Sequence, residues 1–358
     1  MARSQCFRTL AAGWPFVVAL LALPLPAAAR EREVPDPGAP VAAAGLHEVH
    51  DAVFPGRAPR VARIASANSH ARMYSTDDGH RVEIESSPSY RFDPAADQGV
   101  VDFLASRLHG PELSGLRVYV GAPAEIQRLC GGDAGVVACY SIGESRMFVP
   151  GESVQGIPVE YPLTHEYGHH IASWRSNNPW DALDWGPKHW ASATRVCTYV
   201  HQGLLFPGNQ GRHYRDDPGE GFADGYAHLH YPAVPWYYNE LMRPGPLEFE
   251  AIRRDVLDPW TGPRSRTFRG RLGRGRAKRA FRIRLKLDGS VTLRLAAPAG
   301  ASYSVEAETG GFAAGRVLRS GGGFGVEWCR RRPVEYVKLT VRRRTGAGPF
   351  ALRVRWPG

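Results

Sequence analysis

Hydrophobic and polar positions change their period along the chain, and the change separates regions of different structure. Before Gly110, apolar residues recur at helical spacing, at Val100, Val101, Phe103, Leu104 and Leu108. The short apolar runs at 116–123 and 144–152 are typical of buried strands, and residues 157–260 form a mostly helical region with long loops. This mixture of strands and helices predicts an α+β domain over residues 65–260.

After residue 260 the pattern becomes one of β-strands. Segments with alternating or β-branched residues lie between Gly and Pro turns: RAFRIRLKLDG, SVTLRLAAPAG, ASYSVEAET, EYVKLTVRRR and FALRVRWPG. Several short strands at regular spacing predict an all-β sandwich. We expect this second domain to cover residues 265–358, with the boundary near 258–268.

The first 29 residues have the composition of an export signal. Arg3 and Arg8 precede the apolar run WPFVVALLALPLP, and Ala27 to Ala29 offer small residues for cleavage. The alternative is a membrane anchor, but the run is shorter than the ~20 residues of a spanning helix. We therefore expect a signal peptide over residues 1–29, a protein secreted to the extracellular space and no transmembrane segment.

Residues 30–64 are rich in Ala, Pro and charged side chains, as in EREVPDPGAPVAAAG. This composition predicts a linker or pro-segment with little core of its own. The segment contains no cysteine, so a thiol from it could not block a metal ion.

Signal cleavage would leave four cysteines: Cys130, Cys139, Cys197 and Cys329. An even number in an exported chain predicts two disulfides, with three possible pairings, whereas the alternative is buried free thiols. The spacing CGGDAGVVAC favours a local Cys130–Cys139 bond, which would leave Cys197 and Cys329 to join distant regions. Sequence alone does not settle the pairing.

The positive charge of the chain is concentrated near its end. The net charge is +10, and 23 of the 45 Lys and Arg residues, but 5 of the 35 Asp and Glu residues, follow residue 260. Such a surface would attract anionic polymers or membranes in a salt-dependent manner. The alternative is a solvated face without a partner.

Candidate chemistry lies in LTHEYGHHIA, residues 163–172. His165 and His169 are four residues apart, so a helix would place both imidazoles on one face, where they could share a Zn²⁺ ion. Glu166 would lie beside that face, within reach of a water molecule at the ion, which is the H-E-x-x-H arrangement of zinc hydrolases. We expect His170 to point away and to pack or face solvent.

A catalytic zinc site needs a third protein ligand and an open position for water. A third His six residues after His169 is excluded, because Arg175 occupies that position. Glu220, in DPGEGFADGYAHLH, is the expected ligand, and Asp224 on the same helix face would accept the free N–H of a ligating histidine. Four other residues are weaker alternatives for the third ligand: His228, His230, Asp181 and Asp184.

The combined motifs resemble those of the gluzincin metallopeptidases. The matching residues are His165, Glu166, His169, Glu220 and Asp224. The resemblance implies a zincin-type catalytic domain, with a small mixed sheet and active-site helices. The segment HYRDDPGEGFADGYAHLH is similar to the lethal-factor-like branch, in which a Tyr just before the Glu ligand stabilises the transition state. This implies a catalytic role for Tyr214, although its spacing to the Glu is one residue shorter than in that branch; His213 and Tyr226 are alternatives.

These expectations define a secreted zinc-dependent peptidase with Glu166 as general base. The resemblance of LDGSVTLRLAAPAGASYSV and GPFALRV to β-sandwich domains of secreted bacterial peptidases implies an accessory C-terminal domain. The strand at 145–152 is the candidate edge for pairing with an extended substrate, and the alternative is an interior strand. We expect a peptide or protein substrate and no specific nucleic-acid partner.

Two other functions are compatible with the sequence. One is a secreted surface-binding protein in which the metal site is structural or vestigial and the basic β domain carries the function. The other is a zinc hydrolase that acts on a non-peptide amide. A His, Glu, His, Glu set argues against the first, because a structural zinc site favours four protein ligands and no general base.

Overall fold

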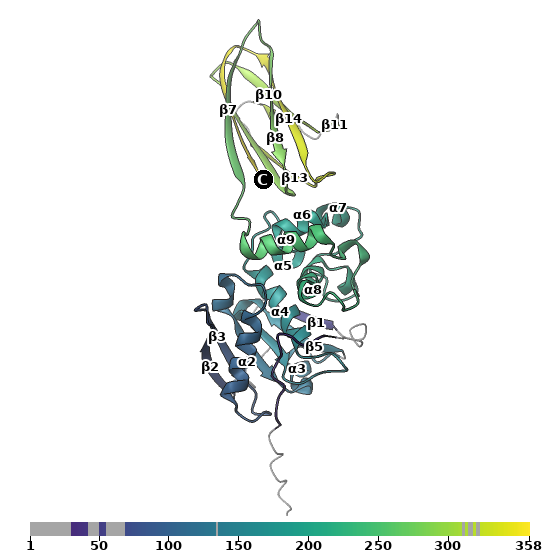
Figure 1. Cartoon of the computed structure of the whole chain (residues 1–358). Coiled ribbons are helices and arrows are strands. Elements are labelled where there is room, and N and C mark those ends of the chain that lie inside the picture. The colour runs from purple at the N-terminus through teal and green to yellow at the C-terminus, as the bar shows by residue number, and fades with distance from the viewer. Residues whose placement is uncertain are drawn as a thin grey trace, which may run out of the picture.

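The computed structural model describes residues 30–41, 50–54, 69–133, 135–309, 312–313, 318–319 and 323–358. Figure 1 shows an α+β body at the N-terminal side and a body of β-strands at the C-terminal side, with a layer of helices between the first sheet and the β-strands. The expected α+β fold with an antiparallel β domain is confirmed. The expected signal peptide lies outside the described residues.

The first domain contains a six-stranded mixed sheet in the order β1-β5-β6-β4-β3-β2. Its strands are β1 His50–Phe54, β2 His70–Ser75, β3 Arg81–Ser86, β4 Arg117–Gly121, β5 Val136–Ser141 and β6 Arg146–Pro150. Strand β5 runs antiparallel to β6, whereas β1 runs parallel to β5 at the outer edge. The sheet therefore ends, on one side, in a short strand from the N-terminal segment.

Eight described α-helices and four 3-10 helices complete this domain. The α-helices are α2 Pro94–Ala105, α3 Pro123–Leu129, α4 Glu160–Ser173, α5 Ala182–Trp185, α6 Lys188–Ala193, α7 Val196–His201, α8 Pro218–His230 and α9 Pro246–Leu257. The 3-10 helices are η2 Pro111–Gly115, η3 Ile142–Glu144, η4 Tyr214–Asp216 and η5 Glu240–Met242. The helical character predicted for residues 157–260 is thus confirmed.

Helix α4 is the central element of the first domain. Every residue from Glu160 to Ala172 is buried, because α4 packs on strands β5 and β6 with one face and on α8 with another. A Cβ atom at Gly168 would lie 2.8 Å from the Cα atom of Ala223 on α8. The absence of a side chain at Gly168 therefore permits the two helices to approach closely.

Two described parts of the segment that precedes the first domain pack against that domain. Residues 30–41 lie against the domain: the Arg32 guanidinium forms a buried ion pair with Asp97, and Val41 belongs to the main hydrophobic core. Residues 50–54 form β1. Their contacts are made with elements far along the chain, so these described residues pack on the first domain, which their composition did not predict.

The candidate substrate edge predicted at residues 145–152 is also wrong. Strand β6 lies between β5 and β4, so both of its edges are paired. The alternative, an interior strand, holds. Strand β1 forms this edge of the sheet, and β5 lies between β1 and β6.

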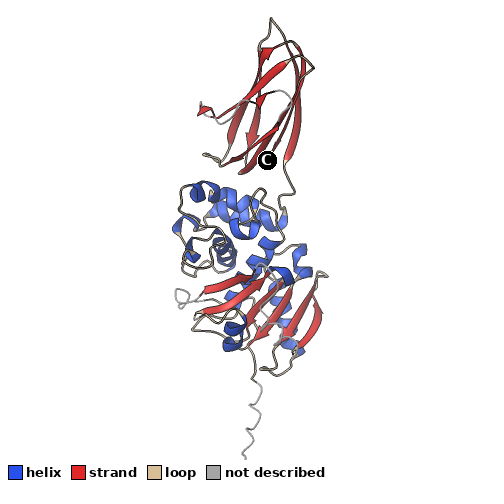
Figure 2. Ribbon diagram, turned by 180° about the vertical axis from the view of Figure 1, so that it is seen from behind, coloured by secondary structure: helices blue, strands red, loops and turns tan. Residues whose placement is uncertain are grey.

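The second domain consists of two packed antiparallel sheets. One has the order β11-β10-β14-β8, with β12 also paired to β10, and the other has the order β13-β9-β15-β7. The strands are β7 Arg264–Leu272, β8 Lys278–Leu285, β9 Gly289–Ala296, β10 Ser302–Thr309, β11 Phe312–Ala313, β12 Leu318–Arg319, β13 Gly323–Trp328, β14 Glu335–Thr345 and β15 Gly348–Trp356. Alternate side chains from both sheets form one hydrophobic core, as the period of two predicts. Figure 2 shows the strands of the two sheets from behind, in red.

Two disulfides are present, and they include the local pair that the spacing favours. Cys130 follows α3 and bonds to Cys139 in β5, which closes the Gly-containing loop. Cys197 in α7 bonds to Cys329 in the second domain, so this disulfide joins the two domains. Such bonds are characteristic of proteins that fold in an oxidising compartment. Among the described residues, no helix has the length and apolar character needed to cross a membrane.

Buried polar contacts reinforce the junction between the domains. The Lys188 ammonium donates to the backbone oxygens of Asn177, Asn178 and Asp288 at 2.8–3.1 Å. The Arg330 guanidinium contacts the Asp288 carboxylate at 2.9 Å and the backbone oxygen of Ser192 at 2.8 Å. Because Lys188, Asp288, Ser192 and Arg330 are buried, the contacts fix the β domain on helix α6 and the loop before it.

The contact between α4 and α8 yields a first prediction. Replacing Gly168 by Ala forces a methyl group against the backbone of Ala223, so we expect Gly168→Ala to lower the free energy of unfolding by about 1–3 kcal/mol. Gly225→Ala is the matched control, because a Cβ atom there meets neighbours at 3.4 Å or more. It should be neutral or slightly stabilising. Chemical denaturation measures both, and equal stabilities would contradict the account of α4–α8 packing.

Candidate metal centre

Helix α4 brings the two predicted histidine ligands together. His165 and His169 lie one turn apart on the same face, with ring centroids separated by 5.1 Å, and both side chains are buried. Their Nε2 atoms face a common point. The i, i+4 spacing thus produces the convergence that the sequence predicted.

Helix α8 supplies the predicted carboxylate. Asp217 caps the helix through a 2.9 Å hydrogen bond from the backbone N–H of Gly219, and Pro218 occupies the first turn. Glu220 then lies in the first turn with its Oε2 atom 3.4 Å from Nε2 of His165 and 3.3 Å from Nε2 of His169. The three residues expected to bind the ion therefore lie together.

A fourth group, which the sequence analysis missed, completes the cluster. Asp51 in β1 places its Oδ2 atom 3.0 Å from Nε2 of His169 and 3.5 Å from Nε2 of His165. Its exposed fraction is 5%. Asp51, His165, His169 and Glu220 offer ligand atoms that all lie within 4.8 Å of one another.

The spacing of these atoms fits a small metal ion. Ligand atoms at the corners of a tetrahedron, about 2.0–2.1 Å from a central ion, lie about 3.3 Å apart. The four distances above range from 3.0 to 3.5 Å. Within the described structure, the buried His165 Nε2 and Glu220 Oε2 atoms have no hydrogen-bond partner, which a bound cation would supply.

The pKa values of His169 and Asp51 reflect strong interactions between the charges of the cluster. Burial lowers the pKa of His169, but the charge of Glu220 and the hydrogen bond to Asp51 outweigh this and raise it to about 10. Burial raises the pKa of Asp51, but both imidazoles hold it well below its ordinary value. The carboxylates thus stabilise positive charge at the centre of the cluster, carried either by protons or by a metal ion.

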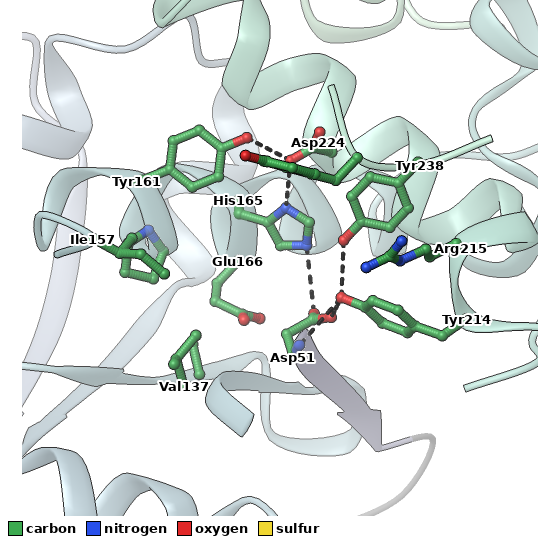
Figure 3. A pocket seen from close by; sticks show the side chains of 13 residues that line it. Asp51, Val137, Ile157, Tyr161, His165, Glu166, Tyr214, Arg215, Asp224 and Tyr238 are labelled. Carbon is green, nitrogen blue, oxygen red and sulfur yellow. Dashed lines mark hydrogen bonds and ion pairs between the residues drawn. The ribbon is translucent and has the colours of Figure 1, made fainter. Parts of the chain in front are cut away.

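Asp224 lies where the sequence predicted a supporting carboxylate. Its Oδ1 atom is 3.5 Å from Nδ1 of His165 and accepts a 2.6 Å hydrogen bond from the Tyr161 hydroxyl. Its Oδ2 atom is 3.3 Å from Nδ1 of His228. Burial raises the pKa of Asp224, but its imidazole partners hold it at about 2. An ionised Asp224 orients His165 with Nε2 toward the cluster (Figure 3).

Glu166 lies beside the cluster without joining it. Its side chain is fully buried, and neither carboxylate oxygen has a hydrogen-bond partner among the described residues. Burial and the charge of Asp51 raise the pKa of Glu166 well above its ordinary value. Figure 3 shows its carboxylate directed into the same pocket as Asp51. An unpartnered buried carboxylate is costly, which is typical of a functional group rather than a structural one.

Two tyrosine hydroxyls complete the polar lining. The Tyr214 hydroxyl donates to Oδ1 of Asp51 at 2.6 Å and lies 2.8 Å from the Tyr238 hydroxyl. Tyr238 was missed from the sequence, although its ring stacks on His165 with centroids 6.4 Å apart. The alternatives to Tyr214 lie elsewhere: His213 stacks on Phe206, and Tyr226 donates to the backbone of Leu108.

The remaining sequence candidates have other partners. His228 Nε2 lies 2.8 Å from the backbone oxygen of Val234, His230 Nε2 accepts from the N–H of Leu108, and Asp181 caps α5. Asp184 lies near Gly208 and is not in the cluster. His170 points away, as expected, with its ring nitrogens 2.9 Å from the Tyr140 hydroxyl and from the backbone oxygen of Glu112.

A pocket opens beside these residues. Its cavity volume is about 50 Å³, and its wall combines cluster residues, the tyrosines and strand β5. Val137 and Ala138 of β5 line it together with His165 and Glu166. The pocket therefore lies between strand β5 and the residues of the candidate metal centre.

Comparisons with known proteins add little to this geometry. No protein-family model and no curated protein matches the chain. One similar solved structure is the Yersinia pseudotuberculosis-derived mitogen, which is 12% identical over 26% of this chain and 85% of the mitogen, with a TM-score of 0.22. A likeness at this level carries no argument about function.

The cluster yields a prediction about metal content. The wild-type protein, supplied with Zn²⁺ and then dialysed, should retain about one zinc ion per molecule. The variants His165→Ala and Glu220→Ala should each lose this ion, because each removes one converging ligand. His213→Ala is the control, since that imidazole pairs with Asp216 outside the cluster. Elemental analysis of the folded proteins measures the zinc content. Retention of the ion by both ligand variants would disprove the assignment of His165 and Glu220 as ligands.

Proposed function

We propose that the protein is a secreted zinc-dependent peptidase. The observation that carries the proposal is the Glu166 carboxylate, buried and without a hydrogen-bond partner among the described residues, beside atoms spaced to hold a metal ion. A structural metal site has no use for such a group, whereas hydrolysis needs a base at this position. Secretion rests on the expected signal peptide and agrees with the two disulfides.

The donor set favours zinc. Two imidazoles and a carboxylate are ligands that zinc accepts in hydrolases, and the spacing fits its tetrahedral geometry. When bound, zinc would lower the pKa of a coordinated water and polarise the carbonyl under attack. The resemblance of His165, Glu166, His169, Glu220 and Asp224 to the gluzincin motifs supports the same choice.

The residues around the cluster have distinct roles in this reaction. Glu166 accepts a proton from the attacking water, whose oxygen bonds to the peptide carbon, and passes it to the leaving nitrogen as the C–N bond breaks. The Tyr214 hydroxyl, with Tyr238 behind it, donates to the carbonyl oxygen as negative charge develops there. Asp224 keeps the His165 ring oriented throughout.

The base assignment can be tested directly. Glu166→Gln should retain its metal but lose hydrolysis of an unfolded protein substrate by at least about 10²–10⁴-fold, because the amide cannot accept the proton. Mass spectrometry of cleavage products, with and without a chelator, measures this. The control is Glu144→Gln, which changes a partly exposed carboxylate in η3 outside the pocket. Normal hydrolysis by Glu166→Gln would refute the general-base role.

For the β domain, we propose an accessory role in binding anionic polysaccharide. Arg294, Arg353 and Arg355 lie exposed on the outer face of the sheet β13-β9-β15-β7, around a hollow that includes Gly323 and Gly325. Arg294 and Arg353 stand opposite each other in register, and no carboxylate pairs with these three arginines in the described part of the chain. Unpaired like charges in direct opposition are unfavourable, so an anionic partner would stabilise them.

The opposite sheet provides the contrast and the control. There, Lys338 pairs with Glu308 at 3.0 Å and Arg342 with Glu306 at 3.4 Å. The double variant Arg294→Gln/Arg353→Gln should therefore elute from immobilised heparin at lower NaCl concentration than the wild type, whereas Lys338→Gln/Arg342→Gln should shift less. Equal shifts would indicate net charge rather than a defined face. Full heparin and surface binding without any hydrolysis would favour the alternative, a surface-binding protein with a structural metal site.

A further inference from the structure

Strand β1 occupies the place where a substrate would pair with the sheet. It lies on the outer edge of β5, with Asp51 opposite Ala138 and Val53 opposite Tyr140. Because Val137 and Ala138 line the pocket with Glu166, a peptide added to this edge would pass the metal-binding atoms. The edge is the one that an extended substrate needs, and the protein's own chain fills it.

The Asp51 side chain of β1 also occupies a position that the proposed reaction needs, next to the two imidazoles. Asp51 Oδ2 lies within 3.5 Å of both imidazole Nε2 atoms, so its carboxylate is placed to act as a fourth ligand beside His165, His169 and Glu220. Hydrolysis requires that the fourth position be open for water. The atom presented there is a side-chain oxygen rather than a peptide carbonyl, so nothing at this position can be cleaved.

The remaining contacts of β1 involve groups that the reaction needs. The Asp51 N–H donates to the Tyr214 hydroxyl at 3.1 Å, and that hydroxyl in turn donates to the Asp51 carboxylate. The Val53 N–H donates to Oε1 of Gln210 at 3.0 Å, and the Gln210 amide donates to Glu220 at 2.7 Å. Strand β1 thus binds Tyr214, the proposed donor to the oxyanion, and Gln210, which holds the ligand Glu220.

We propose that residues 50–54 form an internal inhibitory segment that closes the site until it is displaced. Asp51 acts as the blocking ligand, and β1 blocks the edge of β5. This inference rests on the proposed function. Displacement involves no covalent step: the carboxylate leaves the ion, a water molecule replaces it, and β1 separates from β5. Since β1 is the outermost strand, its departure breaks no other strand pairing.

A permanent structural role for Asp51 explains fewer observations. A closed site of four protein ligands would have no function for Glu166, yet its buried carboxylate faces the same pocket. An inhibitory segment accounts for this carboxylate, because the catalytic groups are complete and only the positions of substrate and water are taken.

The test uses the full-length chain loaded with Co²⁺, whose visible spectrum reports its ligands, and acetohydroxamate as a small metal-binding probe. Asp51→Ala should bind the probe at least about tenfold more tightly than the wild type, because a segment closed nine-tenths of the time already weakens binding tenfold. Peptide hydrolysis should rise in the same variant. Asp77→Ala, which removes an exposed carboxylate in the turn after β2, should resemble the wild type in both measurements.

Val53→Pro provides a second variant that keeps the carboxylate. It removes the N–H that donates to Gln210, so β1 should loosen and probe binding should lie between those of the wild type and Asp51→Ala. Equal probe affinity in wild type and Asp51→Ala overturns the inhibitory segment, whatever the activity. Loss of Co²⁺ from Asp51→Ala also overturns it and makes Asp51 a permanent ligand.

The two proposals fail in distinguishable ways. Tighter probe binding by Asp51→Ala, with no hydrolysis above that of Asp51→Ala/Glu166→Gln, supports the inhibitory segment but refutes the peptidase. Full hydrolysis by the intact wild-type chain, abolished by Glu166→Gln, supports the peptidase but refutes the inhibitory segment.

Discussion

The close contact between α4 and α8 brings together three of the four residues of the candidate metal centre. Gly168 lets the backbone of Ala223 approach, and this distance brings Glu220 on one helix within 3.4 Å of both imidazoles on the other. Helix α4 cannot shift to compensate, because its other face is packed against the sheet. The geometry of the cluster is therefore set by backbone packing, which is stiffer than any of the ligand side chains.

The features set by local spacing could be predicted from the sequence. His165 and His169 share a helix face because of their separation of four, and Glu220 follows a Pro and an Asp that start a helix. The alternation in the last hundred residues likewise predicts two packed sheets. In each case the physical constraint lies within about one turn or one strand.

The features missed from the sequence depend on distant contacts. HDAVF has no pattern that separates it from the Ala- and Pro-rich residues around it, and its partner β5 lies more than eighty residues later. Tyr238 lies in a loop after α8, and only tertiary packing brings its ring onto His165. The interior position of β6 was likewise undetermined, because whether a strand is paired on one edge or both depends on the whole sheet.

Charge balance explains how Asp51 could be held and yet be released. A divalent cation is balanced by two carboxylates, and Glu220 and the ionised Asp224 behind His165 already provide them. A third carboxylate from Asp51 gains a bond to the ion but adds repulsion with Glu166, in a buried site where such repulsion is poorly screened. The segment must then be retained by its pairing with β5 and by the hydrogen bonds to Tyr214 and Gln210. Because these contacts at the edge of a sheet are few, the free energy that holds β1 on β5 is modest. A competing peptide strand could therefore displace the segment.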